Sequence, residues 1–217
     1  MRRPALVLAL AAAAAASPRP ARAQQPIRFT LGASAAAVRV HRDIGSLVQS
    51  LSATALALDA GARRGPLLLV ARYSEGHLTS SDSTVSANDL VEGSAFLGVR
   101  LGSFVTLLAG PHVRAYDAPS GTSRWVFWEA RVQGTAPLIP SRLEAYGELG
   151  ATVLGSSSLV TSFESERSGE VGARYRLAGA PLALRLAYRI ERGSGRLPTR
   201  SDTVEQILVG VQAGWEP

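Results

Sequence analysis

The sequence predicts an all-β chain that closes into a single antiparallel, up-and-down transmembrane β-barrel of ten strands. Three observations support this prediction: long segments in which apolar and polar residues alternate, connections that alternate between short and long, and aromatic residues near the segment ends. Alternation with a period of two is typical of a strand with one apolar and one polar face. The segments also exceed the roughly 5–6 residues that are usual for soluble strands.

Residues 170–191 show the alternation most clearly, as two arms joined by a short turn at residues 178–181. Every second residue is apolar on both arms, for example Val171 and Tyr175 on the first and Leu184 on the second. The intervening positions carry arginine, glutamate, alanine or glycine. The ten predicted strands cover residues 27–40, 48–62, 67–77, 90–101, 104–116, 124–136, 142–154, 170–177, 182–191 and 203–215.

Two of these strands contain an irregularity. In the second, Ser50 begins a polar face, yet Leu56 occupies the same parity, which predicts a bulge or register shift. In the fifth, Pro111 lacks a backbone donor and predicts a second bulge. Gly102 and Ser103, between the fourth and fifth strands, suit a tight hairpin turn. If the second strand is misread, eight strands is the alternative count.

The connections predict which end of the barrel faces outward. The longer, polar ones follow the odd-numbered strands, at residues 41–45, 79–89, 117–123, 155–165 and 193–202, and short turns follow the even-numbered strands. Bacterial outer-membrane barrels have short periplasmic turns, longer external loops and an even strand count. Aromatic residues on the apolar parity would form two interfacial girdles, with Phe29, Tyr175 and Trp215 at the periplasmic rim and Tyr73 and Tyr188 at the outer one.

Residues 1–23 read as a secretory signal peptide. Arg2 and Arg3 form a positive start, residues 5–16 are apolar, and Ala21-Arg22-Ala23 fits a cleavage site. Cleavage near Ala23 would leave a barrel domain of residues 24–217. The apolar part is too short to span a membrane as a helix, which takes about 20 residues.

The composition excludes several classes of function. The 217-residue chain has no cysteine, which rules out a disulfide framework and a thiolate metal site. Of its 23 basic residues, four lie in the leader, so 19 face 17 acidic residues in the remainder. This near balance, without a basic run, gives no case for a nucleic-acid partner. No cofactor-binding motif is present, and no cofactor is expected.

At the level of pattern, residues 26–217 resemble the small bacterial outer-membrane β-barrel proteins, although no signature motif is matched. The resemblance implies a location in the outer membrane of a Gram-negative-type bacterium, contact with membrane lipid and insertion by the barrel-assembly machinery. A monomer is the expected state. Members of that group often end in an aromatic residue, whereas Glu216 and Pro217 follow Trp215 here.

If the apolar parity faces lipid, the other parity fills the lumen with both charge signs. Mutual pairing is then expected, because an unpaired buried charge is costly. The predicted lumen network consists of Arg72, Glu92, Arg100, Arg114, Glu129, Arg131, Glu144, Glu148, Glu170, Arg174, Arg176, Arg185, Arg189 and Glu191.

This network predicts a structural or surface-interaction protein with a filled interior. Two alternatives stay open: a narrow pore for small solutes or ions, and a soluble secreted β-barrel that binds a small ligand with its apolar face inward.

An enzyme is the third alternative. His41, His77 and His112 fall toward the predicted outer ends of strands, and Asp43 and Asp117 could lie near His112. The resemblance to outer-membrane barrels includes lipid-modifying and proteolytic enzymes with histidines at that rim. No catalytic motif surrounds these histidines, and their spacing is not that of a metal site. The prediction is therefore that the protein is not an enzyme.

Overall fold

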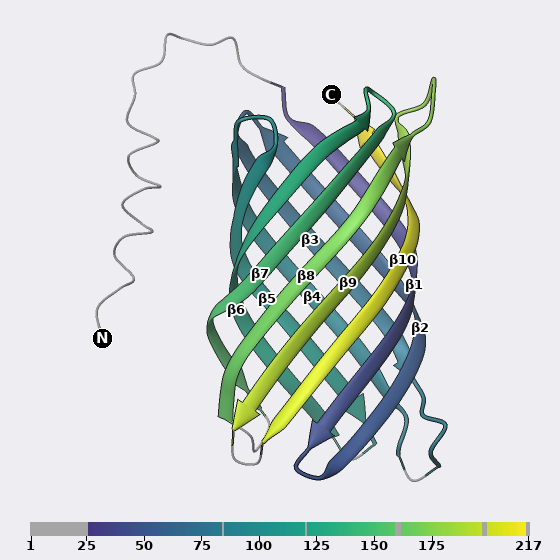
Figure 1. Ribbon diagram of the computed structural model, residues 1–217, viewed down its shortest axis with the longest axis vertical. Helices are drawn as coiled ribbons and strands as arrows, with labels where there is room; N and C mark the ends of the chain where they lie inside the picture. The colour runs from purple at the N-terminus through teal and green to yellow at the C-terminus, as the bar shows by residue number, and fades with distance from the viewer. Residues whose placement is uncertain (1–25, 84, 120, 159–161, 197–198, 216–217) are drawn as a thin grey trace, which may run out of the picture.

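A computed structural model describes residues 26–83, 85–119, 121–158, 162–196 and 199–215, and the side chains of Ser162 and Trp215 are not described. The predicted signal peptide lies outside these residues. Ten antiparallel strands form one closed barrel, as predicted, so the eight-strand alternative is wrong (Figure 1). In the described residues, no helix is both long and apolar enough for a membrane span. The strands are β1 Arg28–Ile44, β2 Leu47–Arg64, β3 Leu67–Leu78, β4 Asn88–Leu101, β5 Val105–Ala118, β6 Gly121–Ile139, β7 Leu143–Ser157, β8 Ser162–Arg176, β9 Leu182–Arg196 and β10 Arg200–Trp215.

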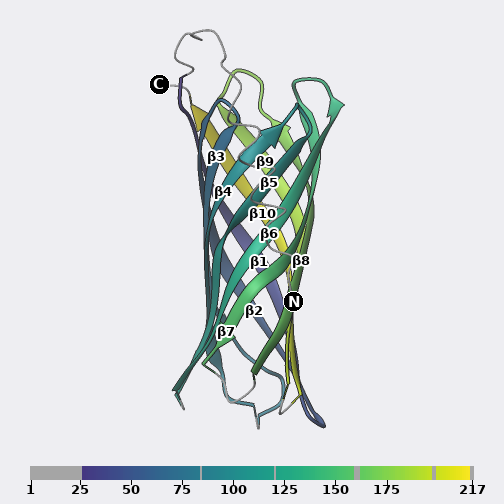
Figure 2. The same ribbon diagram turned by 90° about the vertical axis from the view of Figure 1, so that its left-hand side faces the viewer.

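Each strand pairs with its neighbours in sequence, and β1 closes the barrel against β10. That closing pair runs without interruption from Phe29 opposite Trp215 to Ile44 opposite Arg200. The strands are strongly tilted and enclose an elongated cylinder (Figures 1 and 2). Closure gives every strand a partner on both sides, so backbone donors and acceptors in the paired segments are satisfied within the wall.

The two ends of the cylinder differ in what joins the strands. One end, here called the terminal end, holds the first residue of β1, the last of β10 and the connections 65–66, 102–104, 140–142 and 177–181. The opposite end, the loop end, holds the connections 45–46, 79–87, 119–120, 158–161 and 197–199.

Most of the predicted long loops are wrong. Residues 117–123, 155–165 and 193–202 belong largely to strands, and only residues 79–87 make a long connection. The reason is that the strands continue beyond the apolar stretch of the wall, through polar sequence that still pairs in register. For example, Ser165 pairs with Ser194 inside two segments that the sequence had assigned to loops.

The predicted bulges at β2 and at Pro111 are also wrong. The pairing of β2 with β1 is continuous from Ile44 opposite Leu47 to Arg28 opposite Arg63. Likewise, the β4–β5 register is the same on both sides of Pro111. The irregularities lie between β6 and β7 and between β8 and β9.

The outside of the barrel carries an apolar belt in the half nearer the terminal end. On β9 it runs over nine residues, from Leu182 to Ile190, which matches the roughly 9–11 that a tilted strand needs to cross a membrane. The charged parity faces inward, so the soluble alternative with an apolar interior does not describe this half. The apolar belt includes the exposed residues Leu31, Leu56, Leu58, Leu69, Leu97, Leu107, Trp128, Val132, Leu149, Val171, Leu184, Leu186, Val209 and Val211.

Beyond the belt, toward the loop end, the polarity is reversed. Most outward residues there are polar, as with Arg39, Ser50, Ser52, Glu75 and His77, although Leu47 and Val48 beside the first turn are exposed. Inside, an apolar plug fills the barrel, and each of its side chains is at most 2% exposed. The apolar plug consists of Val40, Leu51, Leu78, Leu90, Tyr116, Trp125, Phe127 and Val204.

This reversal explains the misread second strand. Leu51 and Ala55 point inward into the apolar interior, while Ser50 and Ser52 face out above the belt. Further along, Leu56 continues the Ser50 parity and is exposed within the belt. A change of surroundings along one regular strand thus produced the pattern that predicted a shift of register.

Candidate functional site

The inward parity of the strands places two charged clusters in the lumen, one above the other. Counted along the strands, the terminal-side cluster lies about three to seven residues from the terminal end, and the central cluster about seven to ten. The terminal-side cluster consists of Asp59, Arg72, Glu148, Glu170, Arg185 and Arg189. The central cluster consists of Glu92, His112, Arg114, Glu129, Arg131, Glu166 and Glu191.

Glu170 is the hub of the terminal-side cluster. Its carboxylate accepts hydrogen bonds from Arg185 Nη2 at 2.6 Å, Arg189 Nε at 2.8 Å and the Tyr146 hydroxyl at 2.7 Å. Arg185 Nη1 also donates to Asp59 at 3.0 Å, across the lumen. These charges compensate one another: the cluster has three carboxylates and three guanidinium groups.

Arg72 and Arg131 connect the two clusters. Arg72 donates two parallel hydrogen bonds to Glu148, at 2.8 and 2.9 Å, which is the bidentate geometry of strong arginine–carboxylate pairs. Arg131 Nη1 donates to the same Glu148 at 2.8 Å, and its Nε donates to Glu129 at 2.7 Å. The guanidinium of Arg131 also lies over the Phe96 ring, 4.5 Å from its centroid.

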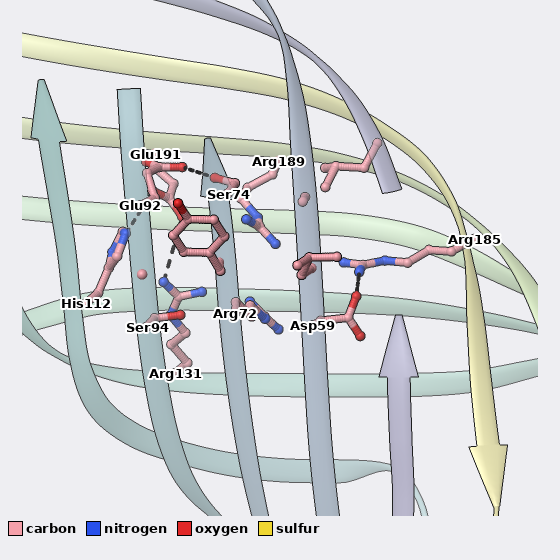
Figure 3. A pocket seen from close by; sticks show the side chains of 15 residues that line it. Asp59, Arg72, Ser74, Glu92, Ser94, His112, Arg131, Arg185, Arg189 and Glu191 are labelled. Carbon is pink, nitrogen blue, oxygen red and sulfur yellow. Dashed lines mark hydrogen bonds and ion pairs between the residues drawn. The ribbon is translucent and has the colours of Figure 1, made fainter. Parts of the chain in front are cut away.

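The central cluster surrounds the one buried histidine among the described residues. His112 is 4% exposed, and its Nδ1 lies 2.6 Å from Glu129 Oε1. Its Nε2 lies 3.9 Å from Oε2 of Glu191, which is drawn beside it in Figure 3. Arg114 joins Glu191 to Glu92, with its Nε 2.5 Å from Glu92 Oε1. The remaining carboxylate, Glu166, is 1% exposed and accepts from Thr152 through Oε2 at 2.9 Å.

Ten of the fourteen residues in the predicted network join these two clusters. The other four lie nearer the terminal end: Glu144 pairs with Arg174 at 3.1 Å, Arg100 donates to the Ser103 carbonyl, and Arg176 lies at the end of β8.

Sequence reasoning missed Asp59, Glu166 and Asp202. Asp59 lies on β2, whose faces were ambiguous. Glu166 lies between a predicted loop and the next predicted strand, and Asp202 fell in a predicted loop. Their parity within an extended strand is the only sequence signal that could have placed them inside. Asp202 forms a third, smaller group near the loop end, bonded to Arg200 at 3.0 and 2.9 Å and 3.5 Å from Arg42.

The two aspartates that were expected near His112 lie on the other face of the wall. Asp43 and Asp117 are exposed and lie on outward parity, where they accept from Ser201 at 3.1 Å and Thr122 at 2.6 Å. His112 points inward, so the expectation that either aspartate lies near it is wrong.

The other two histidines are not buried. His41 lies 3.0 Å from Ser50, and His77 lies 2.6 Å from Asp89. Each of these contacts is an exposed pair on the outside of the wall near the loop end.

The lumen is open at one end and filled further in. A cavity of about 530 Å³ occupies the terminal end, here called the vestibule. Two carboxylates line it, Asp59 and Glu144. The arginines that line it are Arg28, Arg63, Arg72, Arg100, Arg174, Arg176 and Arg185. A second cavity of only about 20 Å³, close to the space of one water molecule, lies beside His112, and the apolar plug follows.

No protein-family model and no curated protein matches this sequence. Solved structures do match its fold. The outer-membrane protease OmpT from Escherichia coli aligns with a TM-score of 0.59 at 9% identity, over 91% of this chain and 99% of that one. An outer-membrane channel from Pseudomonas putida F1 aligns with a TM-score of 0.50 at 10% identity, over 92% of this chain and 100% of that one. At these identities the likeness concerns the fold alone.

Proposed function

We propose that this protein is a non-conducting barrel of the bacterial outer membrane, with a structural or surface-interaction role. The observation that carries the proposal is the pairing of an apolar belt outside with a filled interior. A continuous exposed apolar surface of this extent would drive a soluble protein to aggregate. Lipid would cover this apolar belt, because the belt is about as tall as the hydrocarbon core of a membrane is thick.

The orientation follows from the strand count. In bacterial barrels with an even number of strands, both termini lie on the periplasmic side. The terminal end and its vestibule would then face the periplasm, and the polar exterior around the apolar plug would project outside the cell. That projecting part is where a surface partner would bind. Its exposed polar residues include Arg39, Asp43, Ser52, Glu75 and His77.

The closed interior supports a non-conducting role. Ion pairs at 2.8–3.0 Å bridge the lumen between strands that are not neighbours, as between Arg185 and Asp59 or Arg72 and Glu148. Beyond them Trp125 and Phe127 stack with ring centroids 6.1 Å apart, and Phe163 packs against Phe127 at 5.5 Å. The proposed role needs no catalytic centre, and His112 lies behind this plug, where a large external substrate would not reach.

The test combines location with conductance. The protein should pellet with outer membranes, show heat-modifiable mobility on gels, and give no stable current in planar lipid bilayers. Recovery of folded protein in the soluble fraction would contradict membrane insertion. A stable open current would contradict the filled lumen.

A narrow anion path is the second candidate, and the vestibule favours it, because seven arginines and two carboxylates line that cavity. Under this alternative, bilayers with a salt gradient should show a current whose reversal potential indicates anion selectivity. Absence of current under the same conditions supports the first candidate.

A further inference from the structure

We propose that the central cluster binds one divalent transition-metal ion through His112, Glu129 and Glu166. The inference does not depend on the surface role proposed above. It rests on an excess of buried negative charge, on a carboxylate oxygen without a partner, and on donor atoms close enough together to share an ion.

The charge excess distinguishes the central cluster from the terminal-side cluster. The terminal-side cluster balances three carboxylates with three guanidinium groups. The central cluster has four carboxylates but only Arg114 and Arg131 as fixed cations, so two carboxylates inside the wall have no guanidinium counterpart. Such an excess in a low-dielectric interior is strongly unfavourable unless another cation joins it.

Arginines nearer the loop end do not remove this excess. Arg42 and Arg200 both pair with Asp202. Their guanidinium groups also lie over aromatic rings of the plug, 4.5 Å from the centroid of Tyr116 and 5.9 Å from that of Trp125. Their surplus charge is therefore engaged with the plug and not with the central cluster.

Glu166 gives an independent indication of a missing partner. Oε2 of this carboxylate accepts from Thr152, but Oε1 is buried and has no hydrogen-bond partner among the described residues. The side chain is only 1% exposed. A buried carboxylate oxygen without a donor is rare in folded proteins and calls for a ligand or a proton.

The geometry places suitable donors around that oxygen. One ligand atom each from His112, Glu129 and Glu166 lie within 4.8 Å of one another. Metal–ligand distances of about 2.0–2.2 Å bring donors to a comparable spacing. An imidazole with two carboxylates suits zinc and neighbouring divalent ions better than calcium or magnesium, which prefer all-oxygen sites.

Glu92 is a structural neighbour and not a ligand. Its oxygens accept from two side chains that are not ligands, Oε1 from Arg114 at 2.5 Å and Oε2 from Gln206 at 2.8 Å. Glu129 differs, because its Oε1 contacts His112, which is itself a proposed ligand. The 2.6 Å contact between His112 Nδ1 and Glu129 Oε1 is a hydrogen bond in which the carboxylate accepts the Nδ1 proton. Binding of the ion displaces that proton, as is general when histidine and carboxylates become ligands.

The small cavity offers a route that reaches the site at His112, while Glu129 and Glu166 lie behind its lining. It is lined by His112, Glu191 and Arg131, and it shares Asp59, Arg72 and Arg185 with the lining of the vestibule. The arginines of the vestibule oppose the entry of a cation into the folded barrel. We therefore expect the ion to be taken up during folding more readily than by soaking.

The test refolds the full, tag-free chain into detergent with Zn²⁺ or Mn²⁺, removes free metal, and measures bound metal by mass spectrometry. The expected result is one ion per barrel and a higher thermal midpoint than for protein refolded with chelator. Mg²⁺ refolding serves as the hard-ion comparison and should give neither effect.

The deciding variant is Glu166→Gln, which keeps the size of the side chain and an oxygen for Thr152. It should lose at least tenfold in metal affinity and the metal-dependent rise in thermal midpoint. His112→Gln should do the same. The matched control is His77→Gln, because His77 also lies 2.6 Å from a carboxylate but is exposed; it should bind one ion, like the parent.

Heat-modifiable gel mobility shows whether each variant folds. If the His112→Gln variant does not fold, the metal binding of Glu166→Gln alone decides the test. Less than 0.2 ion per barrel in the parent, or equal binding by Glu166→Gln and the parent, would overturn the proposal. Protons would then compensate the central cluster.

Discussion

The two halves of this barrel use the same ten strands with opposite polarity. Near the terminal end, Leu184 and Leu186 are exposed and Arg185 between them is buried. Near the loop end, Trp125 and Phe127 are buried and Arg124 is exposed. The strands continue from one half into the other in unbroken register, as β1 and β10 show. The difference therefore lies in what surrounds each half, lipid around one and water around the other.

Tyrosines mark the boundary between the halves. Tyr73 and Tyr188 are the last outward aromatic residues of the belt on their strands, and their hydroxyls donate to Glu75 at 2.6 Å and Glu205 at 3.1 Å. A ring that is apolar on one side and hydrogen-bonded at its tip suits a membrane interface. At the opposite rim Tyr175 is 41% exposed, and the side chain of Trp215 is not among those that the structure describes.

The largest expected effect comes from the charged interior of the terminal half. Glu170→Ala removes the acceptor that Arg185, Arg189 and Tyr146 share, and it leaves buried guanidinium groups uncompensated. We expect a loss of about 3–5 kcal/mol in the free energy of unfolding, measured by urea unfolding in detergent or lipid. Glu75→Ala, which breaks an exposed contact outside, should lose less than about 1 kcal/mol. Equal losses would contradict the difference between interior and exterior.

The second prediction concerns the plug of the loop half. Phe127→Ala removes a fully buried ring and should lower the free energy of unfolding by about 3 kcal/mol. The matched control is Trp128→Ala, one residue further along the chain, whose side chain is 54% exposed on the outside. If Trp128→Ala lowered the free energy of unfolding more than Phe127→Ala, the apolar plug would not act as a hydrophobic core.

The third prediction separates the two exteriors. Leu186→Arg places a charge in the middle of the apolar belt and should cost about 2–4 kcal/mol for folding into lipid vesicles. Ser52→Arg, on the exterior of the loop half, should cost close to zero, because that surface meets water. A similar cost at both positions would mean that the belt does not end where the polar residues begin.

The smallest effect is expected at the boundary itself. Tyr188→Phe removes one hydrogen bond to Glu205 and keeps the ring, so the free energy of unfolding should fall by at most about 1 kcal/mol. Tyr188→Ala should lose more, because the ring also covers apolar surface at the interface. If Tyr188→Phe lost as much as Tyr188→Ala, the hydroxyl and not the ring would hold this position.

The sequence by itself determined the strands, their number and the parity of the wall. Period-two alternation comes from the local geometry of an extended chain, so Arg185 between Leu184 and Leu186 was sufficient to assign opposite faces. The length of the apolar runs favoured an outward apolar face in the terminal half, but the sequence left a soluble barrel with the opposite orientation open.

Only the tertiary structure decided where the strands end, which charges meet and where the polarity reverses. Asp59 and Arg185 are 126 residues apart and meet because tilt and closure bring β2 and β9 to face each other across the lumen. Glu166 became a buried residue because β8 continues through polar sequence that resembles a loop. Such outcomes depend on pairing between distant strands, and no local pattern records that pairing.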